Sequence, residues 1–89
     1  HNFQQMVGQI KRQIETIARA IQAQEQETEW KEAHSIKGGA LNLNAARLGE
    51  LALQLEQAGK AADFSKAAEL LPGLKEELNR LEKFIMGIN

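Results

Sequence analysis

Apolar residues recur at alternating spacings of three and four along this 89-residue chain, and this spacing restricts its fold more than any other feature. The first such stripe consists of Phe3, Val7, Ile10, Ile14, Ile17 and Ile21, and the last of Phe64, Ala67, Leu71, Leu74, Leu78, Leu81, Ile85 and Ile88. Residues at these spacings lie on one face of an α-helix. Both segments are therefore predicted to be amphipathic helices. Pro72 lies inside the last one and deletes a backbone hydrogen bond, so we expect it to kink or split that helix.

Two shorter helices with apolar stripes are predicted between these segments. The apolar face of the first consists of Ala33, Ile36, Ala40 and Leu43, and that of the second of Leu48, Leu51, Ala52, Leu55 and Ala58. Four such helices joined by short loops bury all four stripes when they pack against one another. We therefore expect an all-α fold, an antiparallel up-down four-helix bundle in which residues 1–89 form a single domain.

Capping residues give the expected ends of these helices. Thr28 is expected to N-cap the second helix, after a frayed end and loop over residues 22–27, because its hydroxyl can accept a hydrogen bond from a free amide. Asn44 suits the left-handed conformation that closes the second helix, and Gly59 is a natural stop for the third. Asp63 is expected to N-cap the fourth helix.

The composition excludes several classes of function. A net charge of −1, from 11 basic and 12 acidic residues, gives no strong field for nucleic acid. The sequence has no cysteine, which excludes disulfides and thiolate zinc sites, and one usable histidine is too few for another metal site. No apolar run approaches the length of a membrane span, so we expect no direct membrane contact. The absence of cysteine suits a reducing compartment, and we expect a cytoplasmic location.

The only histidine beyond the first residue is His34, in the stretch A-H-S-I-K-G-G-A-L-N-L-N. At 100° per residue it lies about 140° from the centre of the apolar face, so its ring should point outward. Lys37 and Gly38 are its i+3 and i+4 neighbours, and Trp30 and Leu41 extend the same strip of helix surface. Lys37 could hold a phosphoryl or carboxylate oxygen. The apolar side chains of Trp30 and Leu41 could contact a docking partner.

Two adjacent glycines, Gly38 and Gly39, follow this lysine inside a predicted helix. Each costs up to about 1 kcal/mol relative to alanine in a helix interior. Gly38 lies next to His34 on the helix surface, so its missing side chain should leave space for a reaction partner beside the ring. For Gly39 two explanations remain open, which are access to the site and close packing of helices.

The run H-S-I-K-G-G-A-L-N-L-N-A resembles the signature of histidine phosphotransfer (HPt) domains, a helical histidine followed by x-x-K-G. The resemblance continues through L-G-E-L-A-L-Q-L-E-Q-A-G-K-A-A-D-F and covers residues 30–64, while the outer helices match only as amphipathic stripes. Two positions depart from the family pattern. Asn44 stands where the family has a turn glycine, and Gly39 stands where serine or alanine is frequent.

The resemblance implies a phosphorelay intermediate of two-component signalling. His34 would take a phosphoryl group from a receiver-domain aspartyl phosphate and pass it to another receiver aspartate, with Lys37 compensating charge. Glu56 follows His34 by 22 residues and matches a third-helix glutamate that accepts a hydrogen bond from the histidine in related domains of chemotaxis kinases. Glu56 would then hold the Nδ1 proton and leave Nε2 to attack, unless it is only a solvated helix residue. The Mg²⁺ ion of the reaction is expected on the receiver, and no cofactor is expected here.

Partners implied by the resemblance are response-regulator receiver domains, and we expect the isolated domain to be monomeric. The alternative is a helical adaptor domain without covalent chemistry. Autokinase activity is not expected, because Ser35 stands where dimeric phosphoacceptor helices carry an acid and no nucleotide-binding glycine motif is present. The chain begins with His1 rather than methionine, which favours a domain of a larger sensor kinase over a stand-alone protein.

Overall fold

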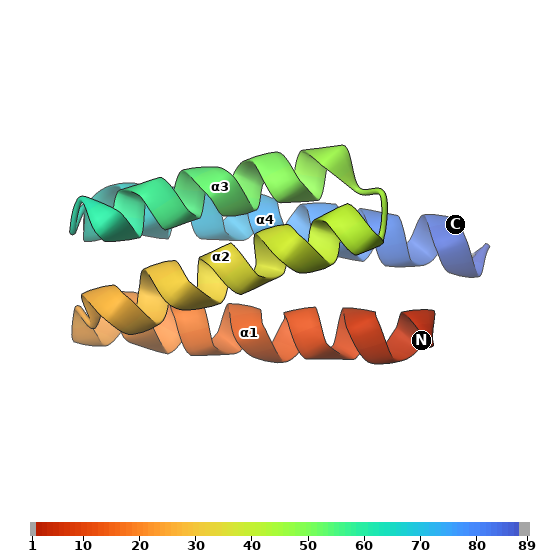
Figure 1. Cartoon of the computed structure of the whole chain (residues 1–89), viewed down its shortest axis with the longest axis horizontal. Coiled ribbons are helices and arrows are strands. Elements are labelled where there is room, and N and C mark those ends of the chain that lie inside the picture. Colours follow the sequence, from red (N-terminus) through yellow and green to blue (C-terminus); the bar gives the residue numbers. More distant parts are fainter. Residues whose placement is uncertain (1, 88–89) are drawn as a thin grey trace.

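The computed structural model describes residues 2–87. They form four helices, which are α1 (Phe3–Ala23), α2 (Gln26–Asn42), α3 (Ala46–Lys60) and α4 (Phe64–Met86). Successive helices run in opposite directions, each packs on its neighbours in the chain, and α4 returns to pack on α1 (Figure 1). This is the antiparallel up-down four-helix bundle that the four stripes predict. None of the helices in residues 2–87 combines the length and the apolar character that crossing a bilayer requires.

The apolar stripes meet inside the bundle as predicted. The buried members are Val7, Ile10, Ile14 and Ile17 of α1, Ala33, Ile36 and Ala40 of α2, Leu48, Leu51, Ala52, Leu55 and Ala58 of α3, and Ala67, Leu71, Leu74 and Leu78 of α4. Phe3, Ile21, Leu43 and Leu81 pack partly buried against them. Ile85 departs from the prediction and is 45% exposed, because the end of α4 extends past the other helices (Figure 1). Ile88 lies outside the described residues.

Two of the predicted helix ends are confirmed. Asn44 adopts the left-handed conformation with φ 54°, directly after Leu43, the C-cap residue of α2. Asp63 caps α4, since its side chain accepts a hydrogen bond from the Lys66 amide at 3.0 Å. Both residues satisfy backbone groups that a helix end leaves without partners.

The prediction for the start of α2 is wrong. The loop expected over residues 22–27 shrinks to Gln24 and Glu25, and Glu25 rather than Thr28 is the N-cap residue. Gln24 takes a left-handed conformation with φ 56°, which ends α1 abruptly and turns the chain directly into the next helix. Thr28 therefore lies in the first turn of α2.

The end expected for α3 at Gly59 is off by one residue, and of the two outcomes expected for Pro72, a kink or a split, the split is not observed. Gly59 does not end α3, which continues to Lys60, and Ala62 takes the positive φ of 55°. Pro72 does not split α4, which is continuous from Phe64 to Met86. Because Pro72 is exposed, water can reach the carbonyl that lacks its amide partner.

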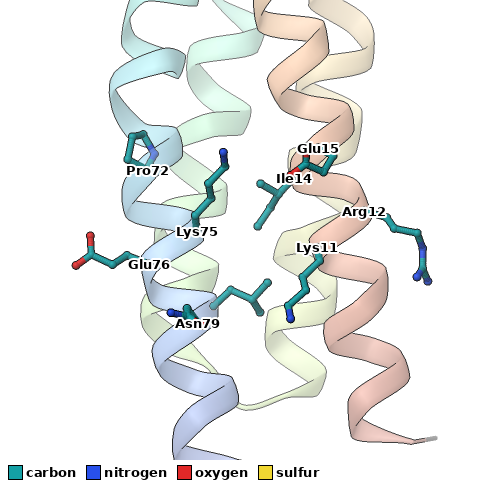
Figure 2. A pocket seen from close by; sticks show the side chains of 9 residues that line it. Lys11, Arg12, Ile14, Glu15, Pro72, Lys75, Glu76 and Asn79 are labelled. Atoms are coloured by element: carbon teal, nitrogen blue, oxygen red, sulfur yellow. The ribbon is translucent and has the colours of Figure 1, made fainter. Parts of the chain in front are cut away.

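A groove lies between α1 and α4, with a volume of about 640 Å³ (Figure 2). Lys11 and Lys75 extend into the space between these two helices, whereas Arg12 and Glu76 point away from it. Since each helix packs on two neighbours in a ring, this groove is on the opposite side of the bundle from the contact between α2 and α3.

Candidate functional site

His34 lies on the outer surface of α2, as its position relative to the apolar stripe predicts. Burial of Ala33 and Ile36 fixes the rotation of the helix, and the His34 side chain is 59% exposed. The ring turns towards α3, where its Nδ1 atom lies 3.1 Å from Oε2 of Glu56. The contact expected between His34 and Glu56 is therefore present, and the other ring nitrogen, Nε2, is the one not engaged by this carboxylate.

Glu56 is the centre of a cluster of charged groups. Its side chain is only 6% exposed, because it faces His34 and Lys37 of α2 in the contact between α2 and α3. The Lys37 ammonium lies 3.0 Å from Oε1, and the Lys60 ammonium lies 3.2 Å from Oε2. One buried carboxylate therefore faces three nitrogen groups from two helices, and it shares Oε2 between His34 and Lys60.

The charge state of Glu56 decides which nitrogen of His34 carries the proton. Burial acts to raise the pKa of the Glu56 carboxyl, but the ammonium groups of Lys37 and Lys60, together with His34, outweigh burial and hold this pKa at about 2. The carboxylate is thus ionised near neutral pH and can only accept hydrogen bonds. A neutral imidazole must then donate through Nδ1, which leaves the lone pair on Nε2.

Lys37 forms an ion pair with the other oxygen of this carboxylate. Its Nζ atom lies 3.0 Å from Glu56 Oε1. The Lys37 side chain is 31% exposed and lies one helical turn from His34. The ammonium group can therefore turn towards an anionic group that approaches the ring.

Lys60 belongs to this cluster and was missed in the sequence analysis. Its Nζ atom lies over the Trp30 ring, 4.9 Å from the ring centroid, while it pairs with Glu56. Its carbonyl oxygen accepts a hydrogen bond from Gln26 Nε2 at 2.9 Å, which ties the end of α3 to the start of α2. The i,i+4 spacing of Glu56 and Lys60 is the sequence signal that could have found it.

The two glycines after Lys37 face different surroundings. A side chain at Gly38 would meet no atom within 4 Å, so the surface next to His34 is open as expected. A Cβ at Gly39 would lie 3.6 Å from Cδ1 of Ile10, at ordinary contact distance from α1. An alanine would therefore fit at this position, so close packing of α1 and α2 does not require a glycine there. Leu41, further along the same surface, is 77% exposed, and Trp30 is half-buried.

Glu29 is a second buried carboxyl group in the contact between α2 and α3, and nothing in the sequence analysis singled it out. It is fully buried, and neither of its oxygens has a hydrogen-bond partner. Burial raises the pKa of Glu29 to about 7. Its near neighbours include Gly59 and Trp30, so it lies directly beneath the contact between Trp30 and Lys60.

The cluster around His34 suits an anionic group. Within residues 2–87, no three His, Asp or Glu side chains lie close enough together to hold a metal ion. The groups near the ring are one carboxylate and two ammonium groups, so an incoming phosphoryl group would meet a local excess of positive charge.

Fold and site together define a helical bundle that presents one histidine, hydrogen-bonded through Nδ1, beside a lysine and an open glycine. The family model described as the Hpt domain matches residues 2–84, and the chain belongs to this family. Searches of curated protein sequences and of solved structures gave no significant match. Membership assigns the chain to phosphotransfer in two-component signalling, in which Hpt domains interact with receiver domains.

Proposed function

We propose that His34 is the phosphoacceptor of this domain, and that it takes a phosphoryl group from a receiver aspartyl phosphate and passes it to another receiver aspartate. The observation that carries this proposal is the 3.1 Å contact between His34 Nδ1 and the ionised Glu56 carboxylate. This contact fixes the tautomer in which Nε2 is the nucleophile. The ring is also exposed, so a receiver domain can reach it.

The proposed transfer conserves atoms and charge without a cofactor on this domain. The Nε2 lone pair attacks phosphorus, the bond between phosphorus and the aspartate oxygen breaks, and its electron pair leaves with the receiver carboxylate. The ring then carries a positive charge that the Glu56 carboxylate stabilises across the Nδ1 hydrogen bond. In the second transfer a carboxylate oxygen of the acceptor aspartate forms a bond to phosphorus, the bond between phosphorus and Nε2 breaks, and its electron pair returns to the ring.

Lys37 is proposed to stabilise the charge of the transferring phosphoryl group. Phosphoryl transfer depends chiefly on positioning and on electrostatic stabilisation, and an ammonium group one turn from the histidine supplies both. The position of Lys37 supports this role, because its side chain is 31% exposed and lies one helical turn from His34.

The proposed receiver-binding surface consists of Trp30, Gly38 and Leu41 around the exposed ring. Leu41 offers a large apolar side chain to a partner, and Gly38 leaves room for the receiver loop that carries the aspartate. We expect the Mg²⁺ ion of the reaction to come with the receiver. We further propose that the domain acts as a monomer in the cytoplasm.

The experiment that tests this function is transfer from a phosphorylated receiver domain. The chain is incubated with several radiolabelled receivers, and label should appear that is labile to acid and stable to base, as a phosphoramidate is. His34→Gln should abolish it. Ser35→Ala, which removes the adjacent hydroxyl, should retain it. Label that survives His34→Gln, or no label with any receiver, would leave the helical adaptor as the better description.

A further inference from the structure

Lys60 occupies a position that the proposed chemistry does not use. Its Nζ atom lies 3.2 Å from Glu56 Oε2, the same oxygen that lies 3.1 Å from His34 Nδ1. Lys37 contacts the other oxygen, Oε1. Two groups therefore compete for one oxygen atom of the carboxylate that orients the histidine.

We propose that Lys60 is a positioning residue that acts through Glu56 and limits how strongly this carboxylate favours a protonated His34 ring. The inference rests on the proposed function, because it concerns how much of His34 is present as the neutral nucleophile. The ion pair with Lys60 partly neutralises the negative charge of Oε2. This weakens the hydrogen bond that Oε2 accepts from Nδ1–H of His34. Its own positive charge also disfavours a second positive charge on the ring.

The indole ring of Trp30 keeps Lys60 in this place. The Lys60 ammonium lies 4.9 Å from the ring centroid, within the range of a cation–π interaction. The Lys60 carbonyl is held separately by Gln26. An exposed lysine would ordinarily sample many conformations, so these contacts from α2 explain how it stays beside Oε2.

The charged and titratable groups that face Glu56 are few. His34 and Lys37 approach from α2, and Lys60 approaches from α3 itself. Of the two lysines, only Lys60 shares an oxygen atom with the ring, so only its removal leaves Oε2 to His34 alone.

The test is a comparison of pH profiles. Phosphorylation of the chain by phosphoramidate, a small donor that needs no docking surface, is measured against pH for the parent and for Lys60→Met. The methionine keeps an apolar stem against Trp30 and removes the charge. We expect the profile of Lys60→Met to move to higher pH by roughly 0.3–0.7 unit, as the loss of an exposed ion pair produces, with an unchanged plateau at high pH.

A second measurement reads the ring without phosphorylation. In Lys60→Met, the midpoint of the nitrogen-15 NMR titration of the His34 imidazole should move in the same direction as the pH profile and by the same amount. Lys60→Arg should restore the parent titration. Lys31→Met is the matched control, since Lys31 also lies over Trp30, at 5.9 Å, but pairs with Glu27 instead of Glu56.

These measurements separate the two proposals. A parent chain that phosphoramidate does not phosphorylate at all counts against the function of His34, while the NMR titration still reports on Lys60. Coincident titrations of the parent and Lys60→Met would overturn the role of Lys60. An equal shift in Lys31→Met would overturn it as well, because any surface charge would then have the same effect. A lowered plateau without a shift would also overturn this role, because Lys60 would then act on the reaction without changing the protonation of His34.

Discussion

Glu29 of α2 and Gly59 of α3 face each other so closely that a methyl group on Gly59 would overlap the Glu29 carboxyl group. A Cβ atom there would lie 2.7 Å from Glu29 Cδ and 2.9 Å from Trp30 Cβ. Real Cβ atoms do not approach other atoms this closely, and Trp30 Cβ cannot turn away as the end of a flexible chain can. Gly59 is therefore the residue that lets the end of α3 and the start of α2 approach each other closely.

Gly59→Ala should destabilise the fold, because the methyl group pushes α2 and α3 apart. We expect a loss of about 1–3 kcal/mol in the free energy of unfolding, measured by urea denaturation. Gly38→Ala is the matched control, since a side chain at Gly38 meets open space. That variant should be more stable than the parent by up to about 1 kcal/mol. Equal effects of the two changes would contradict the close approach at Gly59.

Glu29→Gln should change how stability depends on pH. The pKa of Glu29 is raised to about 7 in the folded chain, against 4.5 for an ordinary glutamate. The folded state therefore keeps a proton that the unfolded state loses. This contribution is fully present below about pH 4.5 and is lost as the pH rises through about 7.

Glutamine cannot ionise, so the stability of the variant should not fall with rising pH in this way. Relative to the parent, Glu29→Gln should gain stability between pH 4.5 and pH 8, by at least about 1.4 kcal/mol, the value of one pH unit of proton affinity. Thermal or urea unfolding at both pH values measures the difference. A constant difference would mean that Glu29 ionises normally in the folded chain.

Glu56→Ala should slow phosphorylation of His34, because nothing then fixes the proton on Nδ1. We expect a loss of about 10- to 100-fold, the range found when a group that orients an imidazole is removed. Rates with phosphoramidate and with a phosphorylated receiver should fall alike. Glu50→Ala, at an exposed position of the same helix, is the control and should react at the parent rate. An unchanged rate in Glu56→Ala would leave Glu56 with a structural role only.

Lys37→Met should slow transfer from both donors, since the ammonium is proposed to act on the phosphoryl group itself. We expect a reduction of about tenfold or more in rate, equivalent to about 1.4 kcal/mol of transition-state stabilisation. Circular dichroism should show an intact fold, because Lys37 is partly exposed. The Lys31→Met variant should behave as the parent does in the same assay.

Gly38→Leu should separate docking from chemistry. The leucine side chain would fill the open surface beside His34 and obstruct a receiver domain, while a small donor could still reach Nε2. We expect receiver-dependent transfer to fall at least about tenfold and phosphoramidate labelling to persist. Helicity should be unchanged or higher, since leucine is a better helix former than glycine. Undiminished transfer from the receiver would show that the partner does not need this space.

The fold could be predicted from the sequence because its determinants are local. The spacing of apolar residues fixed each helix, and Asn44 and Asp63 marked helix ends through their own backbone and side chain. The errors occur where a tertiary contact decides. Gly59 is needed for the approach of Glu29 rather than for a helix end, and no local pattern predicts that.

The pairing of His34 with Glu56 was predicted from the resemblance alone, and the antiparallel hairpin of α2 and α3 accounts for it. Residues equally far from the turn of such a hairpin face each other, and both residues are eleven positions from Ala45. The same rule pairs Trp30 with Lys60, each fifteen positions from Ala45. The resemblance implied a role for Glu56 but none for Lys60. The burial of Glu29 has a sequence signal that was missed, because Glu29 lies four positions before Ala33 and so continues the spacing of the apolar stripe of α2.

The most extensive helix contact in the described chain is that between α2 and α3, and the least extensive is that between α1 and α4. Local opening of a protein begins where few buried contacts are lost. Fluctuations of the native state should therefore separate α1 from α4 while the central hairpin stays closed. Amide hydrogen exchange should then be slowest in α2 and α3. The distance between His34 and Glu56 should therefore stay constant during these fluctuations, since both residues belong to the hairpin of α2 and α3, which opens last.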